Sequence, residues 1–84
     1  MTGFPLLLDV TGRRVLVVGG GVVATRRAIA LAAAGAQVRV VAPKVSEDLH
    51  GVDVDLELRE FADSDLDGAW LAVAATDNPT VNSA

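Results

Sequence analysis

Three consecutive glycines, Gly19, Gly20 and Gly21, follow directly on a run of valine and leucine and precede an alanine-rich segment. Glycine loses more backbone freedom on folding than any other residue, so three in a row are costly in regular secondary structure. Such a run is expected where the backbone must turn sharply or approach another group so closely that a side chain would be in the way. The chain is therefore limited to folds in which a strand ends at a tight corner.

The residues on both sides of the glycines predict a strand, a helix and a second strand. Residues 15–20 (VLVVGG) lack polar alternation, which is typical of a strand buried on both faces of a parallel sheet. Residues 22–34 are dense in alanine and stop before Gly35, a common residue just beyond a helix C-terminus. Residues 36–43 predict the second strand, which Pro43 ends. This order is that of a βαβ unit, so we expect an α/β fold with a parallel sheet.

Two more strands are expected further along the chain. Residues 52–61 alternate apolar and charged side chains, which indicates a half-exposed strand near a sheet edge. Residues 70–75 (WLAVAA) form a second uninterrupted apolar run, so we expect a buried strand with Trp70 in the core. Short helical turns are expected after Ser46 and within residues 62–69.

The last residues predict the start of another helix. Asp77 or Asn78 is a suitable N-cap, and Pro79 suits the first helical turn. The chain of 84 residues stops partway into that helix. We therefore expect residues 1–84 to form one domain that is truncated at its C-terminal side.

The composition excludes several functional classes. A formal net charge of −4 and the lack of a basic stripe argue against nucleic acid as a partner. The chain has no cysteine and a single histidine, His50, so we expect neither disulfides, a cysteine nucleophile nor a metal site. No stretch approaches the roughly 18 apolar residues of a membrane span, and the N-terminus lacks the basic region of a signal peptide. A cytoplasmic protein without membrane partners is expected.

Gly19, Gly21 and Ala24 match the pattern G-x-G-x-x-[GA] between a predicted strand and a predicted helix. In Rossmann-type folds the first glycine permits the tight turn and the second lets the backbone approach a pyrophosphate. The third small residue lets the helix pack on the strand. The helix N-terminus then presents free N–H groups to the phosphates. The alternative is a turn used only for packing, which explains Gly19 and Ala24 but leaves Gly20 and Gly21 without a role.

One part of the dinucleotide fingerprint is missing. The acidic residue that usually ends the second strand and holds the ribose is replaced by Ala42, Pro43 and Lys44. We expect backbone groups or Lys44 to hold the ribose, and the choice between NAD and NADP stays open. Thr76 and Asp77 follow a predicted strand at the same carboxyl edge of the sheet, where they either line the site or cap the last helix.

Four segments in order resemble the N-terminal domain of siroheme synthase and the stand-alone precorrin-2 dehydrogenase/sirohydrochlorin ferrochelatase proteins: PLLLDVTGR, VVGGGxVAxRR, AGAQVRVVAP and AATDN..VN. The resemblance covers nearly the whole chain. It implies NAD-dependent oxidation of precorrin-2 to sirohydrochlorin in siroheme or cobalamin biosynthesis, followed in family members by insertion of ferrous iron. By position it implies that NAD contacts Gly19, Gly20, Gly21, Val22, Val23, Ala24, Pro43, Lys44, Thr76 and Asp77.

The chain departs from the family in two ways. The segment between the second and third strands is shorter than usual. The aspartate that the family uses in catalysis and chelation, and the region through which its members form homodimers, are expected beyond Ala84. We therefore assign no catalytic residue and expect the chain alone to be inactive.

Two alternative functions stay open at this point. The first is a non-catalytic nucleotide-sensing module of the Rossmann type, as in potassium channels or redox-responsive repressors. Such modules normally keep the acid after the second strand, which this chain lacks. The second is a truncated product that folds poorly and has no activity, because the exposed edges of half a sheet would favour aggregation.

Overall fold

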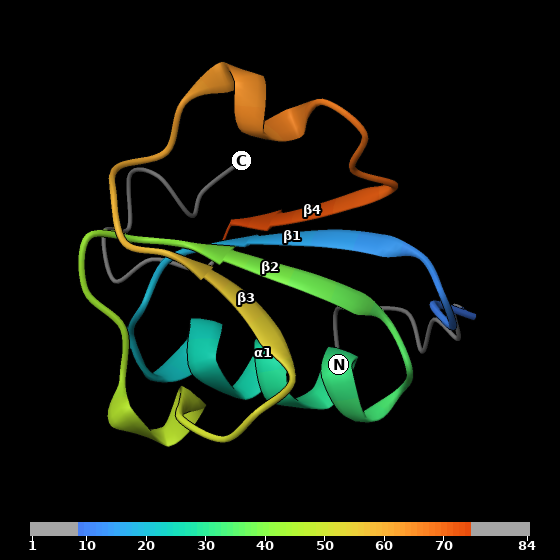
Figure 1. The fold of residues 1–84 in the computed structure, drawn as a ribbon, viewed down its shortest axis with the longest axis horizontal. Coiled ribbons are helices and arrows are strands. Elements are labelled where there is room, and N and C mark those ends of the chain that lie inside the picture. Colours follow the sequence, from blue (N-terminus) through green and yellow to red (C-terminus); the bar gives the residue numbers. More distant parts are fainter. Residues whose placement is uncertain (1–8, 75–84) are drawn as a thin grey trace, which may run out of the picture.

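The computed structural model describes residues 9–74, which form a four-stranded parallel sheet with one α-helix and two short 3-10 helices. The elements in chain order are β1 (Arg14–Val18), α1 (Val22–Ala33), β2 (Gln37–Val41), η1 (Glu47–Leu49), β3 (Val54–Glu57), η2 (Asp63–Leu66) and β4 (Leu71–Ala74). The strands lie side by side in the order β3-β2-β1-β4, and each pairing is parallel (Figure 1). The α/β fold of Rossmann type that the sequence predicts is confirmed.

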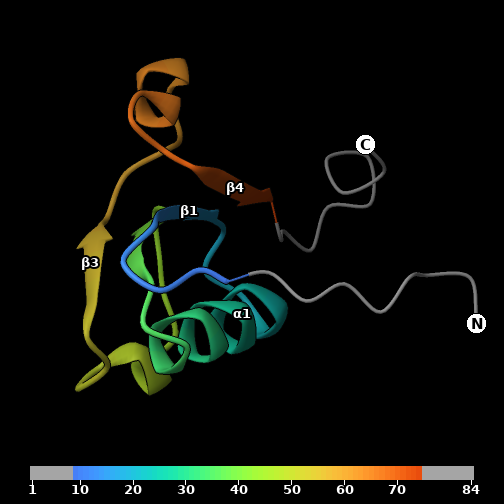
Figure 2. The ribbon, with the colours of Figure 1, turned by 90° about the vertical axis from the view of Figure 1, so that its right-hand side faces the viewer.

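β1 lies in the middle of the sheet because its side chains tolerate burial on both faces. Val15, Leu16 and Val17 are all buried, and β1 pairs with β2 on one side and β4 on the other. Helix α1 lies against one face of the sheet (Figure 2). Its buried residues Ala24 and Ala28 are small, which lets the helix axis come close to the strands.

The core lies between α1 and the sheet. Its buried members are small or medium-sized: Val10, Val15, Val17, Ala24, Ala28, Ala36, Val38, Val40 and Leu49. Leu49 comes from η1, which contacts α1. Ser46 is the N-cap of that short helix, and its Oγ accepts a hydrogen bond from the Asp48 N–H at 3.1 Å. The predicted helical turns at η1 and η2 are therefore both confirmed, and η1 contributes to the core.

The expected burial of Trp70 and of the last strand is wrong. Trp70 is 46% exposed, and the guanidinium of Arg13 lies 5.0 Å from the centre of its ring. β4 is an edge strand whose residues alternate between half-buried and exposed. Among the described residues β4 has one neighbouring strand, and α1 covers only one face of the sheet. An uninterrupted apolar run does not by itself distinguish a central strand from an edge strand.

β3 forms the other edge of the described sheet, as its alternating pattern predicts. The apolar and charged alternation continues through Leu58 and Arg59, but the strand ends at Glu57, so the expectation that Leu58 shares the apolar face is wrong and its side chain is exposed. The expected helix start at Asp77 or Asn78 lies outside the described residues. Within residues 9–74, no helix is long and apolar enough to cross a membrane.

Candidate functional site

An open cleft of about 730 Å³ lies at the carboxyl edge of the sheet. Its lining comes from the last residues of β1 and β2 and from the segments that follow β1, β2 and β3: Val18, Gly19, Gly20, Gly21, Val41, Ala42, Pro43, Lys44, Glu60 and Phe61. Parallel strands all end at one edge, which brings these three segments together although they are far apart in the sequence. Open α/β sheets bind their ligands at this edge, and the volume lies within the range of about 300–1,000 Å³ for small-molecule sites.

The glycine turn begins with a backbone conformation that favours glycine. Gly19 has a φ of 127°, in a region that residues with a side chain rarely adopt. Its N–H donates a hydrogen bond to the Val41 carbonyl at 3.0 Å, which ties the turn to the end of β2. The role predicted for the first glycine, a tight turn directly after β1, is confirmed.

Gly20 lacks a side chain because another loop occupies the space. A Cβ built on Gly20 would overlap the carbonyl oxygen of Lys44 and lie 2.8 Å from the Lys44 carbonyl carbon and 3.0 Å from the Val45 Cα. The glycine turn and the loop after β2 are therefore in backbone contact beside the cleft. This corrects the expectation that packing alone would leave Gly20 without a role.

Gly21 is the N-cap of α1, and no side chain caps this end of the helix. The first α1 hydrogen bond runs from the Thr25 N–H to the Gly21 carbonyl at 2.9 Å, so the N–H groups before it have no partner within the helix. The first turn contains no acidic residue. The helix N-terminus thus offers donors and a partial positive charge without a competing carboxylate.

The other predicted contact residues differ in their surroundings. Val22 and Val23 are exposed at the start of α1, whereas Ala24 is buried in the core, as expected for the small residue that packs the helix on the sheet. Pro43 and Lys44 are exposed and line the cleft. The predicted contacts Thr76 and Asp77 lie outside the described residues.

Glu60 and Phe61 line the cleft although the sequence did not predict them as site residues. Phe61 is 39% exposed, and Glu60 carries the one carboxylate among those of residues 9–74 that line the cleft. Their signal was available: a predicted third strand of a parallel sheet must also end at the ligand-binding edge. The dinucleotide fingerprint, by contrast, specifies residues only at the first turn and at the end of the second strand.

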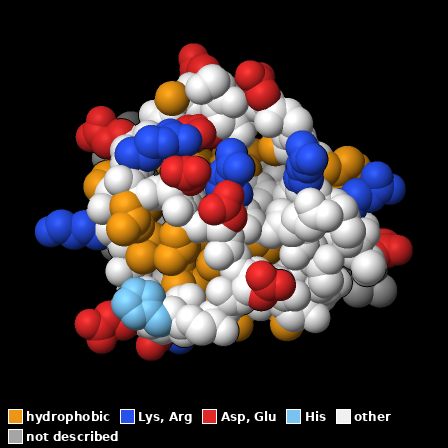
Figure 3. All heavy atoms as spheres, in the orientation of Figure 1, with side chains coloured by type: hydrophobic (Ala, Val, Ile, Leu, Met, Phe, Trp, Pro, Cys, Tyr) orange, Lys and Arg blue, Asp and Glu red, His pale blue; other side chains and the backbone are white. Residues whose placement is uncertain are grey.

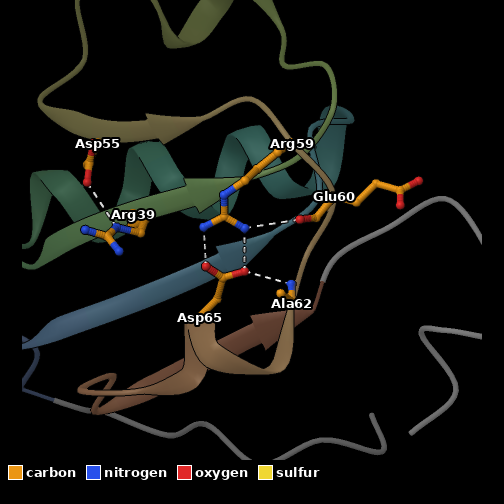
Figure 4. Close-up of polar contacts among 6 residues, drawn as sticks. All are labelled: Arg39, Asp55, Arg59, Glu60, Ala62 and Asp65. Carbon is orange, nitrogen blue, oxygen red and sulfur yellow. Dashed lines mark hydrogen bonds and ion pairs between the residues drawn. The ribbon is translucent and has the colours of Figure 1, made fainter.

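An ion pair fixes the loop that carries these two residues. The Asp65 side chain is 3% exposed and accepts hydrogen bonds from both terminal nitrogens of Arg59, Nη1 at 2.8 Å, and from the Ala62 N–H at 2.8 Å. Arg59 Nη1 also donates to the Glu60 carbonyl at 3.1 Å (Figure 4). These donors, Arg59 first and the Ala62 N–H second, lower the pKa of Asp65 to about 2. The loop between β3 and η2 is therefore held at several points.

Acidic and basic side chains are intermixed over the face that β3 presents (Figure 3). One example is the exposed pair of Arg39 and Asp55, whose Nε and Oδ2 atoms lie 3.0 Å apart. Pairs of this kind contribute at most about 1 kcal/mol to stability. In the part of the chain that the structure describes, no three His, Cys, Asp or Glu side chains come together in a way that could hold a metal ion.

Comparison with known proteins finds relatives over nearly the whole chain. Residues 6–84 match a family model described as "Putative NAD(P)-binding". The siroheme synthase of Azotobacter vinelandii (strain DJ / ATCC BAA-1303) is 47% identical over 87 residues, which cover 99% of this chain and 19% of that protein. The siroheme synthase of Pseudomonas fluorescens (strain SBW25) is 45% identical over 87 residues, with the same two coverages, 99% and 19%.

A solved structure agrees with these relatives. SirC, precorrin-2 dehydrogenase, superimposes with a TM-score of 0.82 and 36% sequence identity, over 96% of this chain and 43% of that one. The chain therefore spans about a fifth of the length of the siroheme synthases that it matches, and less than half of the dehydrogenase.

Proposed function

The chain belongs to the NAD(P)-binding family that includes the N-terminal domain of siroheme synthase, and on that premise we propose that its cleft binds NAD. The pyrophosphate would rest on the turn formed by Gly19, Gly20 and Gly21. The observation that carries this proposal is the N-terminus of α1, which has no side-chain cap and directly follows that turn beside the cleft. Backbone N–H groups at such a site bind phosphate oxygens, and the helix dipole favours the negative charge.

The remaining predicted contacts are part of the same proposal. Val22 and Val23 would contribute their backbone N–H groups, Ala24 would keep the helix close to the sheet, and Pro43 and Lys44 would flank the adenosine half.

The proposal also includes Thr76 and Asp77 as contacts of the nucleotide; they follow β4 in the chain, and β4 pairs with β1 up to the Val18–Ala74 register. This pairing brings the end of β4 to the same edge as the glycine turn.

In the complete protein we propose that the bound NAD serves the oxidation of precorrin-2 to sirohydrochlorin. NAD supplies a hydride acceptor, and this chain's residues bind and orient the nucleotide. The catalytic aspartate that would also serve iron insertion, and the homodimer interface, are proposed to lie in other parts of that protein, which we expect to be cytoplasmic. This chain alone would then bind the cofactor without turning over the tetrapyrrole.

Isothermal titration of the chain with NAD tests this function. The wild type should bind, and Gly21→Val should reduce the affinity at least tenfold, because its methyl groups would occupy the space of the pyrophosphate. Ala33→Val is the matched control, since it places the same valine side chain at the other end of α1. Wild-type affinity in Gly21→Val would contradict the proposed site.

A further inference from the structure

The order of the strands indicates which half of the nucleotide lies near β3. The glycine turn that would hold the pyrophosphate follows β1, in the middle of the sheet. In Rossmann-type sites the ribose of the adenosine half lies at the end of the second strand. With the order β3-β2-β1-β4, a nucleotide that extends over β2 next reaches the end of β3. Glu60 and Phe61 are therefore on the adenosine side of the cleft.

Glu60 supplies a carboxylate to the cleft, which the end of β2 does not. The end of β2 offers only Ala42, Pro43 and Lys44. The Ala42 N–H donates a hydrogen bond to the Glu57 carbonyl at 3.1 Å, which holds the ends of β2 and β3 together. The loop after β3 thus brings a carboxylate to the cleft from the neighbouring strand. A carboxylate accepts the hydrogen bonds that two ribose hydroxyl groups donate.

The Glu60 side chain is not used by the ion pair beside it. Arg59 bonds to the carboxylate of Asp65 and to the backbone carbonyl of Glu60. The Glu60 side chain extends away from that pair (Figure 4). The Arg59–Asp65 pair therefore fixes the backbone at Glu60 and leaves its carboxylate available for a ligand.

Phe61 adds an apolar surface at the same end of the cleft. It is 39% exposed and shares the lining with Pro43. An aromatic ring stacks favourably on the flat face of a nucleobase, because stacking removes the faces of both rings from water. Phe61 and Pro43 come from adjacent segments after β3 and β2, so they can flank one planar ring.

We propose that Glu60 holds the adenosine ribose and that Phe61 contacts the adenine ring, an assignment that rests on the proposed nucleotide-binding function. Glu60 then acts as a specificity residue. Its charge repels the 2′-phosphate of NADP, whereas Lys44 without Glu60 would attract that phosphate. The site thus selects NAD through Glu60, a carboxylate that follows β3, in place of the usual carboxylate at the end of β2.

Isothermal titration of the 84-residue chain with NAD, NADP and ADP-ribose tests the assignment. The wild type should prefer NAD to NADP. Glu60→Gln keeps the shape of the side chain, and it should weaken NAD and ADP-ribose about tenfold, the loss expected for hydrogen bonds to a charged acceptor. Glu60→Gln should also reduce the ratio of the NAD affinity to the NADP affinity. Phe61→Ala should lower the affinity for all three nucleotides, and Phe61→Tyr should leave these affinities unchanged.

Asp53→Asn is the matched control, because it removes one negative charge just before β3, at the amino ends of the strands and away from the cleft. It should leave all three affinities unchanged. Thermal unfolding of each variant checks that the fold is kept.

If the wild type binds NAD and Glu60→Gln binds both dinucleotides as the wild type does, the role of Glu60 is refuted and the proposed function stands. If the wild type binds neither NAD nor NADP, the proposed function itself is refuted, and this assignment with it.

Discussion

The carbonyl oxygen of Lys44 lies where a side chain on Gly20 would begin. The turn after β1 and the loop after β2 are thereby in direct backbone contact. The same two segments line the cleft, so its shape depends on the absence of a side chain at Gly20. A requirement of packing and a requirement of ligand binding thus fall on neighbouring glycines.

Gly20→Ala should destabilise the fold by about 1–3 kcal/mol, the usual cost of overpacking. The obstacle is backbone rather than a flexible side chain, so the loops must move apart. Urea unfolding measures the change in the free energy of unfolding. Adding Lys44→Ala should not restore stability, because the carbonyl oxygen remains. A Gly20→Ala variant with wild-type stability would show that the two loops are not in contact.

Asp65 should make stability depend on pH in acid. Its pKa is about 2 in the folded chain against an ordinary value of 3.8, so its ionised form is favoured by folding. This contribution is complete above about pH 4 and is lost as the pH falls toward 2.

Asp65→Asn should therefore lower the thermal midpoint at pH 7 and approach the wild type near pH 2. Asp63→Asn is the control, an exposed change of the same kind in η2. Thermal midpoints measured from pH 2 to 7 decide the matter; parallel profiles for wild type and Asp65→Asn would contradict the role of the ion pair.

Leu49→Ala should cost about 2–5 kcal/mol, the range for removing a large aliphatic side chain from a core. Leu49 is 1% exposed and extends the core from η1 toward α1. Leu58→Ala makes the same change at a position that is 63% exposed, and it should alter stability by less than about 0.5 kcal/mol. Urea unfolding of the two variants compares them directly. Equal losses would mean that η1 does not contribute to the core.

Trp70, the one tryptophan of the chain, should be open to quenching in the folded state. Acrylamide should quench its fluorescence nearly as well before unfolding as after it, because almost half of the residue is exposed. Arg13→Gln removes the cation over the ring and should reduce stability by about 0.5–1 kcal/mol. A native fluorescence that resists acrylamide would contradict the position of Trp70.

The two apolar strand segments show what a hydrophobic pattern predicts about a strand and what it does not. Residues 15–20 and 70–75 look alike in sequence, since both are uninterrupted apolar runs. In the sheet that residues 9–74 form, β1 is nevertheless central and buried, whereas β4 is a half-exposed edge strand. Position in a sheet depends on which strands pair, and pairing is a long-range property.

Only part of the site could be predicted from the sequence, because the rest depends on strand pairing. The turn and α1 are local, so the fingerprint locates Gly19 as the tight turn and Gly21 as the helix start. Glu60 and Phe61 are about 40 residues away and join the cleft only because β3 pairs with β2. No local spacing reports that pairing.

By itself, the sequence determined the strand–turn–helix–strand unit, because glycine conformation, helix periodicity and apolar runs act over neighbouring residues. Tertiary structure alone decided that Gly20 faces the Lys44 carbonyl, that Trp70 is exposed, and that Glu60 lies at the cleft. Each of these depends on contacts between segments that are distant in the chain. Such contacts are set by sheet hydrogen bonds and packing, which no single segment encodes.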